Sequence, residues 1–116
     1  MDVEQLREYC LSKKGVTESF PFDDTALVFK VCGKIFAMIA LDDGWMNLKC
    51  DPEKAIELRE QYPAVMPGYH MNKKQWNTVV LDDSVLSKTI CEWVDDSYDL
   101  VVQKLTKKLR EALPNL

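Results

Sequence analysis

The chain has 116 residues, of which 47% are hydrophobic and 29% charged, and its formal net charge is −4 at pH 7. These proportions are typical of a globular domain and exclude disordered and collagen-like classes. The longest apolar run, Ile35 to Leu41, is far shorter than the about 20 residues of a membrane-spanning helix, and the acidic N-terminus lacks a secretory signal pattern. We therefore expect a single domain over residues 1–116, located in the cytoplasm and outside any membrane.

The four cysteines are too far apart to form a C-x-x-C pair, which argues against a zinc knuckle or a dithiol redox motif. They are Cys10, Cys32, Cys50 and Cys91. Each lies in a largely apolar stretch, where a free thiol behaves as a small hydrophobic side chain. We expect all four to be reduced and structural, which is consistent with a cytoplasmic protein.

The first predicted element is a helix over residues 2–14. Asp2 can cap it and Gln5 stands three residues further on, as in a capping box, while Gly15 supplies the usual residue after the helix. The next segment, residues 19–24, is extended and contains Pro21, which cannot donate to a strand ladder. This segment predicts an edge strand or the beginning of a strand.

Alternating apolar residues then predict three strands joined by short turns, over residues 26–32, 34–41 and 45–50. The first two are expected to form a tight hairpin at Cys32-Gly33, and Asp42-Asp43-Gly44 forms the second turn. Asp51-Pro52 begins a second helix, which Pro63 ends.

The last third of the chain predicts a strand over residues 76–81 and one long helix over residues 87–112, with apolar residues in step with a 3.6-residue period. The whole pattern predicts an α+β fold in which an antiparallel sheet of about five strands packs against helices. The expected order of elements is α-β-β-β-β-α-β-α.

No constellation of catalytic residues is evident. Four adjacent acid pairs occur, but three fall in predicted turns, where aspartate bonds its own backbone: Asp23-Asp24, Asp42-Asp43, Asp82-Asp83 and, on the long helix, Asp95-Asp96. His70 is the only histidine, and no glycine-rich phosphate loop or nucleophile motif is present. We expect no enzymatic activity, no cofactor and no metal site.

Lysines at strand positions are the positive signal. Lys30 and Lys49 interrupt apolar strands, and Lys34 opens another strand directly after the hairpin turn. If one face of the sheet is solvated, Lys30, Lys49, Asn47 and Trp45 are expected to share it. The segment Tyr69–Trp76 adds Lys73 and Lys74 between aromatic residues, as in sites that bind phosphates and stack on bases. The alternative is that these residues have no binding role: the lysines solubilise strand edges, and the tryptophans pack inside the protein.

Several segments together resemble the MmcQ/YjbR family of small bacterial proteins over nearly the whole chain. They are Glu8–Leu11, Ser19–Phe22, Leu27–Phe36, Leu48–Pro52, Tyr62-Pro63, Pro67–Trp76, Ser97–Val102 and Lys104-Leu105. The resemblance implies a compact α+β fold similar to the CyaY-like (frataxin) architecture, with hairpins described as a double wing, and a DNA-binding module without established enzymatic activity. The positions that it marks for nucleic-acid binding are Lys30, Lys34, Lys49, His70, Lys73, Lys74 and Trp76. Phe20, Pro21, Phe22, Ser97 and Tyr98 also match and are interpreted as residues that set the fold.

The net charge of −4 opposes the DNA-binding interpretation, because proteins that coat nucleic acid usually carry a broad positive field. The charge is unevenly distributed, however: residues 82–99 hold six acids and one lysine, and residues 104–110 hold four bases and no acid. The alternative is a module that binds a protein or a small ligand and has no affinity for nucleic acid. With either function we expect a monomer. An unrecognised enzyme or a frataxin-like iron-handling protein are further alternatives.

Overall fold

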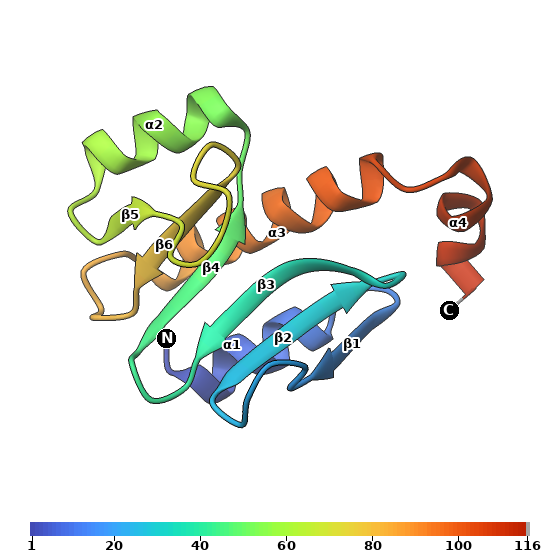
Figure 1. The fold of residues 1–116 in the computed structure, drawn as a ribbon, viewed down its shortest axis with the longest axis horizontal. Helices are drawn as coiled ribbons and strands as arrows, with labels where there is room; N and C mark the ends of the chain where they lie inside the picture. Colours follow the sequence, from blue (N-terminus) through green and yellow to red (C-terminus); the bar gives the residue numbers. More distant parts are fainter. Residues whose placement is uncertain (116) are drawn as a thin grey trace.

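The structure is a computed structural model that describes residues 1–115, and it is built on one six-stranded antiparallel sheet (Figure 1). The order of strands across the sheet is β1-β2-β3-β4-β6-β5. The strands are β1 (Val16–Ser19), β2 (Ala26–Val31), β3 (Lys34–Ala40), β4 (Trp45–Lys49), β5 (Val65–Pro67) and β6 (Trp76–Val80). The helices are α1 (Val3–Leu11), α2 (Pro52–Gln61), α3 (Ser87–Gln103) and α4 (Lys107–Ala112), followed by a short 3-10 helix, η1 (Leu113–Asn115).

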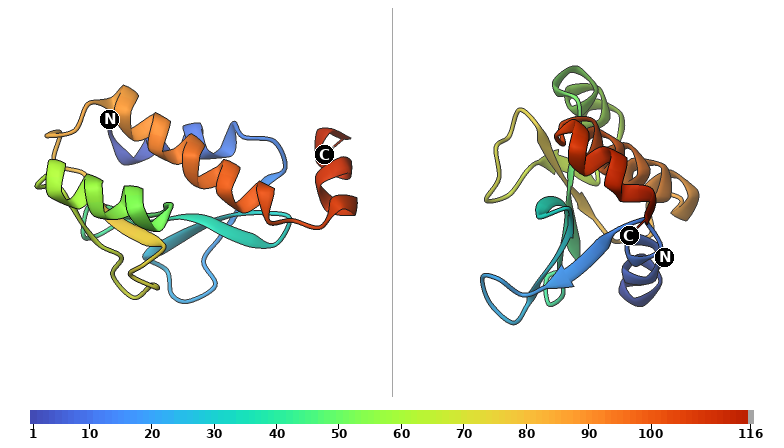
Figure 2. Two further views of the ribbon diagram at one scale, coloured as in Figure 1. Left: turned by 90° about the horizontal axis from the view of Figure 1, so that it is seen from above. Right: turned by 90° about the vertical axis from the view of Figure 1, so that its right-hand side faces the viewer.

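Helices α1, α2 and α3 lie on one face of the sheet, and two loops, residues 20–25 and 68–75, project from the opposite face (Figure 2). We call the latter the open face. The core lies between the sheet and the helices, where Phe29 and Ile39 of the sheet and Leu6 and Val94 of the helices are fully buried. Side chains alternate between the two faces along a regular strand, so most residues between these core positions point to the open face. A register shift between the Phe29 and Lys30 pairings interrupts this alternation, and Phe36 and Ala37 of β3 both join the core. Within the described residues, no helix is both long and apolar enough to cross a membrane.

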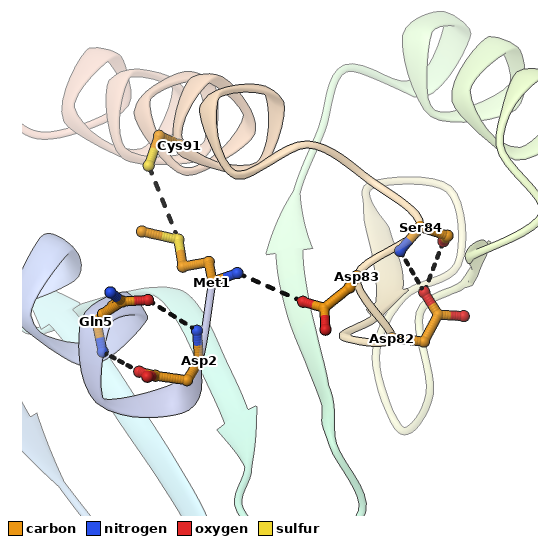
Figure 3. Close-up of polar contacts among 7 residues, drawn as sticks. All are labelled: Met1, Asp2, Gln5, Asp82, Asp83, Ser84 and Cys91. Carbon is orange, nitrogen blue, oxygen red and sulfur yellow. Dashed lines mark hydrogen bonds and ion pairs between the residues drawn. The ribbon is translucent and has the colours of Figure 1, made fainter.

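The beginning of α1 confirms the predicted capping box. The Asp2 carboxylate accepts a hydrogen bond from the Gln5 backbone N–H at 2.8 Å, and the Gln5 side chain accepts one from the Asp2 backbone N–H at 3.1 Å (Figure 3). These bonds satisfy donors that the first helical turn leaves free. The helix ends at Leu11, before the predicted Lys14, and the chain turns at Gly15 with φ +71°.

Turn aspartates behave as predicted where the structure shows their partners. Asp82 accepts hydrogen bonds from the hydroxyl and the backbone N–H of Ser84 (Figure 3), and Asp23 accepts them from Thr25 and Ala26. These bonds stabilise the charged form and therefore lower the pKa of both carboxyl groups. Both side chains therefore remain ionised while they hold their loops.

The predicted hairpin between β2 and β3 is present. Its two central residues, Cys32 and Gly33, have φ angles of +49° and +78°. Two successive positive φ angles are what a type I′ turn requires, and this turn matches the right-handed twist of the strands that it joins. The cysteine occupies a position that asparagine, aspartate or glycine usually fills.

Two parts of the predicted strand pattern differ from the structure. The first edge strand is β1 at Val16–Ser19, and the Pro21 segment is a loop on the open face. A sixth strand, β5, pairs with β6 and was not predicted, because its three residues include Pro67 and carry no alternating pattern. These differences leave the α+β fold and its antiparallel sheet as predicted.

The predicted long helix over residues 87–112 is in fact two helices. Helix α3 ends at Gln103, and Thr106 begins α4 by accepting a hydrogen bond from the Leu109 backbone N–H. Leu105, between them, is buried. Helix α4 turns away from α3 at the end of the molecule that also carries the β2–β3 turn (Figure 1). The break therefore brings the basic residues of the C-terminal segment to this end.

Candidate functional site

Three lysines surround a hollow of about 320 Å³ near the β2–β3 turn. Lys34 is the first residue of β3, Lys49 is the last of β4, and Lys104 directly follows α3; Ile35 and Val101 complete the lining. We call this the basic hollow. It unites two of the predicted site residues with Lys104, which sequence reasoning had placed in a basic segment but not in the site.

A buried serine explains how Lys49 and Lys104 come together. The β3–β4 ladder runs from the Ala40–Trp45 pair to the Ala37–Leu48 pair. At the next position the hydroxyl of Ser97, from α3, lies between the strands: it donates to the Phe36 carbonyl at 2.5 Å and accepts from the Lys49 N–H at 2.8 Å. Helix α3 thus runs along this opening in the sheet and ends beside Lys49.

Carboxylates of the described residues do not compensate the charge of the basic hollow. Within residues 1–115, none of its three lysines forms an ion pair. Partial burial, and then the neighbouring Lys104 ammonium group, lower the pKa of Lys49. Both causes disfavour the charged form, so an anion bound here would relieve the repulsion between the two lysines.

The remaining predicted site residues lie in two other places. Lys30 is half-buried and is the strand partner of Ile35, so it lies next to the basic hollow. His70, Lys73 and Lys74 are exposed in the loop of residues 68–75. Within the described residues these four also form no ion pair.

Trp76 differs from the prediction. Its side chain is only 8% exposed, and a Cβ atom added to Gly68 would lie 2.7 Å from the Trp76 Cβ. The tryptophan therefore packs beneath the 68–75 loop, and its ring is not at the surface, where a base could stack on it.

Asn47 was predicted to share a solvated face with Lys30 and Lys49, but it is completely buried. Its amide group donates to the Tyr69 carbonyl at 2.9 Å, and its side-chain oxygen accepts from the Thr78 hydroxyl at 2.5 Å. The Thr78 oxygen accepts in turn from the Tyr69 N–H at 2.8 Å. Asn47 and Thr78 thus bind the carbonyl and the N–H of Tyr69, and these bonds hold the 68–75 loop over the sheet.

A second hollow, of about 370 Å³, lies between the 20–25 and 68–75 loops at the other end of β2 and β3. Aromatic side chains form its walls, and we call it the aromatic hollow; they are Phe22, Trp45, Tyr69 and His70. Sequence reasoning interpreted Phe22 as a residue that sets the fold, but its side chain is 69% exposed. The cluster of aromatic residues near Tyr69 was the available signal for this hollow.

Comparisons with known proteins agree with this fold over the whole chain. The model of the YjbR family matches residues 11–100. The chain is 36% identical to the uncharacterised protein YjbR of Escherichia coli over 118 residues, an alignment that covers 100% of both chains. It is also 36% identical to the Escherichia coli protein YbdF over 114 residues, 93% of each chain.

Solved structures show the same similarity. The crystal structure of Deinococcus radiodurans protein DR2400 superimposes with a TM-score of 0.90 and 41% sequence identity, covering 97% of this chain and 87% of that one. A crystal structure of a Pseudomonas syringae protein superimposes with a TM-score of 0.74 and 28% identity, covering 86% and 98% of the two chains. With a full-length match in sequence and in fold, the chain belongs to the YjbR family.

Proposed function

We propose that this protein binds nucleic acid, and that the basic hollow is the centre of the contact. One observation carries the proposal: Lys34, Lys49 and Lys104 meet around one hollow although none has a carboxylate partner in residues 1–115. Keeping like charges together costs free energy, which a phosphate group would offset. Lysines supply affinity by neutralising phosphates and releasing their counterions, independently of sequence.

The position of the acidic residues makes this compatible with a net charge of −4. Asp82 and Asp83 precede α3, at the helix end opposite Lys104. Further along α3, Asp95 pairs with Lys13 and Asp96 pairs with Lys54. The basic residues of α4 lie at the same end of the molecule as the β2–β3 turn (Figure 1). The proposed surface is therefore one positive end of an acidic molecule.

The other predicted residues have secondary roles in this proposal. Lys30 adjoins the basic hollow through Ile35 and extends it across β2. Lys73 and Lys74, on the 68–75 loop, offer a second contact to the phosphate backbone on the open face. We assign no phosphate contact to His70, because it lines the aromatic hollow described above. Trp76 has no part in the contact because it is buried.

The test is fluorescence anisotropy with a labelled DNA duplex at 50 and 200 mM salt. If three lysines each neutralise one phosphate, affinity should fall about 40-fold between these concentrations. Lys34→Glu and Lys104→Glu should each weaken binding and lower the salt dependence by roughly one counterion. The matched control is Lys88→Glu, which reverses one exposed charge near the beginning of α3 and should leave affinity nearly unchanged.

The proposal is wrong if the duplex does not bind at 50 mM salt, or if the affinity is indifferent to salt. It is equally wrong if Lys88→Glu weakens binding as much as the substitutions in the basic hollow. That outcome would show that only the total charge matters.

A further inference from the structure

The floor of the aromatic hollow is made of small and flexible side chains. Ala26 and Ala40 are strand partners in β2 and β3, and Met38 lies beside them. Two alanines side by side leave the space that larger side chains would fill, and methionine adapts its shape to what it contacts. The cavity volume of about 370 Å³ lies within the usual range for small-molecule sites.

The walls of the hollow are aromatic and partly unpacked. The rings of Trp45 and Tyr69 meet edge to face with centroids 5.5 Å apart, and His70 lies 4.0 Å from the Tyr69 ring. Tyr69 is 56% exposed and Phe22 is 69% exposed. Large aromatic side chains displayed around a concavity are typical of binding sites.

The loop that carries Tyr69 and His70 is fixed in advance. The buried Asn47 and Thr78 bond both backbone groups of Tyr69, and the Arg59 guanidinium donates to the Lys73 carbonyl at 2.8 Å. His70 has a φ of +60°, a conformation that residues other than glycine adopt rarely. A loop held by buried polar groups while its aromatic rings face solvent is organised for contact with a ligand.

The opposite wall is fixed in a comparable way. The Asp23 carboxylate accepts hydrogen bonds from the backbone N–H groups of Thr25 and Ala26, at 2.9 and 2.8 Å. These bonds close the loop directly after Phe22 and set its position at the rim. Both walls are thus held before any ligand arrives.

The charge at the rim is negative. Asp23 and Asp43 are among the residues that line the hollow, and none of the lining residues is Lys or Arg. Asp23 stays ionised at neutral pH because the hydrogen bonds from its own loop stabilise its charged form. An anion is therefore disfavoured here, in contrast to the basic hollow.

From this combination we propose that the aromatic hollow binds an organic cation, an ammonium group that carries an apolar body. Trp45, Tyr69 and Phe22 line the hollow, and aromatic rings attract a cation through their π electrons. Asp23 and Asp43 add attraction at the rim. The alanine and methionine floor accepts the apolar body. This site goes beyond nucleic-acid binding and does not depend on it, because its charge and its place on the sheet are different.

The test is an NMR titration of the ¹⁵N-labelled protein with phenyltrimethylammonium chloride at constant ionic strength. Benzyl alcohol and benzenesulfonate serve as the neutral and the anionic probe of similar size. We expect saturable shifts at Ala26, Ala40, Tyr69 and His70, with the cation bound roughly two- to fivefold more tightly than the alcohol and the sulfonate weakest.

Two matched pairs of variants separate the contributions of charge and aromatic contact. Asp43→Asn should weaken the binding of the cation roughly two- to fivefold, while Asp42→Asn, one residue away and outside the hollow, should not. Tyr69→Leu should weaken it by a similar factor, while Phe20→Leu, at an exposed position outside the hollow, should not.

Three results would overturn the proposal: no saturable shift with the cation, equal or tighter binding of the neutral or anionic probe, or shifts that centre on Lys34 and Lys49. Failure here would leave nucleic-acid binding untouched. The DNA titration, through Lys34→Glu and Lys104→Glu, tests the basic hollow at the other end of β2 and β3. Its failure would likewise leave the cation site untouched.

Discussion

The two ends of strands β2 and β3 carry opposite chemistry. At one end Lys34, Lys49 and Lys104 form a hollow, and no acidic residue is among its described lining residues. At the other end aromatic rings and two aspartates form a hollow whose described lining residues include no Lys or Arg. Both ends contain the same arrangement of hydrogen bonds. A buried hydroxyl, of Ser97 at one end and Thr78 at the other, accepts a hydrogen bond from a backbone N–H and donates one to a second acceptor. The residues around a hydroxyl, rather than the backbone arrangement, therefore decide what each end can bind.

The hydroxyls of Ser97 and Thr78 also differ in what they support. Ser97 joins two backbone groups inside the sheet, the Phe36 carbonyl and the Lys49 N–H. Thr78 joins the side chain of Asn47 to the backbone of Tyr69, whose own side chain is largely exposed. The Ser97 hydroxyl is therefore part of the frame, by which we mean the sheet and α3. The Thr78 hydroxyl attaches the 68–75 loop to this frame.

The largest expected effect is that of Ser97→Ala. Removing the hydroxyl leaves the buried Phe36 carbonyl without a partner and takes away the acceptor of the half-buried Lys49 N–H, so the free energy of unfolding should fall by about 2–4 kcal/mol. Urea denaturation at pH 7 measures the loss. NMR spectra of the variant should show shifts at the basic hollow and not at Tyr69. A loss below about 0.5 kcal/mol, within the range of an ordinary surface substitution, would contradict the role that we give to Ser97.

Thr78→Val should have a smaller effect, about 1–2 kcal/mol, because the shape is kept. Once the loop moves, water can reach the Tyr69 N–H and the Asn47 side-chain oxygen, which both lose their partner. Amide hydrogen exchange should become faster in residues 68–75 and stay unchanged at the β2–β3 turn. Equal losses in Ser97→Ala and Thr78→Val would remove the distinction between the frame and the attached loop.

Cys32→Asn tests the turn beside the basic hollow, and this substitution should stabilise the protein rather than destabilise it. Cys32 has a φ of +49°, which asparagine tolerates better than cysteine, and Asn-Gly is the preferred pair in a type I′ turn. We expect a gain of about 0.5–1 kcal/mol in the free energy of unfolding. Thermal denaturation measures it, and Cys91→Asn, on α3, is a control that should not stabilise the protein.

The smallest effect is expected at a contact that belongs to neither hollow. Glu18 of β1 accepts two hydrogen bonds from the Arg7 guanidinium, and these bonds, together with the charge of Arg7, lower the pKa of Glu18. A lowered pKa stabilises the folded state above the unfolded value of about 4.3, and this contribution is lost as the pH falls through the folded value. The stability difference between the natural protein and Glu18→Gln should therefore shrink below about pH 4. A difference that stays constant from pH 7 to the acid range would show that the ion pair contributes nothing.

Features that depend on neighbours in the chain were predictable from the sequence. The capping box of Asp2 and Gln5 and the Cys32-Gly33 turn each involve a few consecutive residues with strong local preferences. The interpretation of Tyr98 was also correct, since its ring is buried against Phe36 and its hydroxyl donates to the Lys14 carbonyl. Local backbone geometry determines the capping box and the turn, and the general preference of aromatic rings for the core determines the position of Tyr98.

The two hollows were only partly predictable, because tertiary contacts create them. Lys104 lies near Lys49 because the hydrogen bonds of Ser97 to β3 and β4 hold α3 against the sheet. No pattern in the sequence predicts these two hydrogen bonds. The aromatic hollow exists because the 68–75 loop folds over Asn47 and the 20–25 loop leaves Phe22 outside the core. An isolated Asn in a strand has the same neighbours in the sequence whether its side chain is buried or exposed. The same is true of a Phe beside a proline.

The hydroxyl of Ser97 has a consequence for how the molecule comes apart. Because this hydroxyl occupies the place of a strand-to-strand bond, separation of α3 from the sheet breaks the link between the Phe36 carbonyl and the Lys49 N–H. The Lys49 amide proton should then exchange with solvent when α3 leaves the sheet, so its exchange rate reports how often the helix detaches.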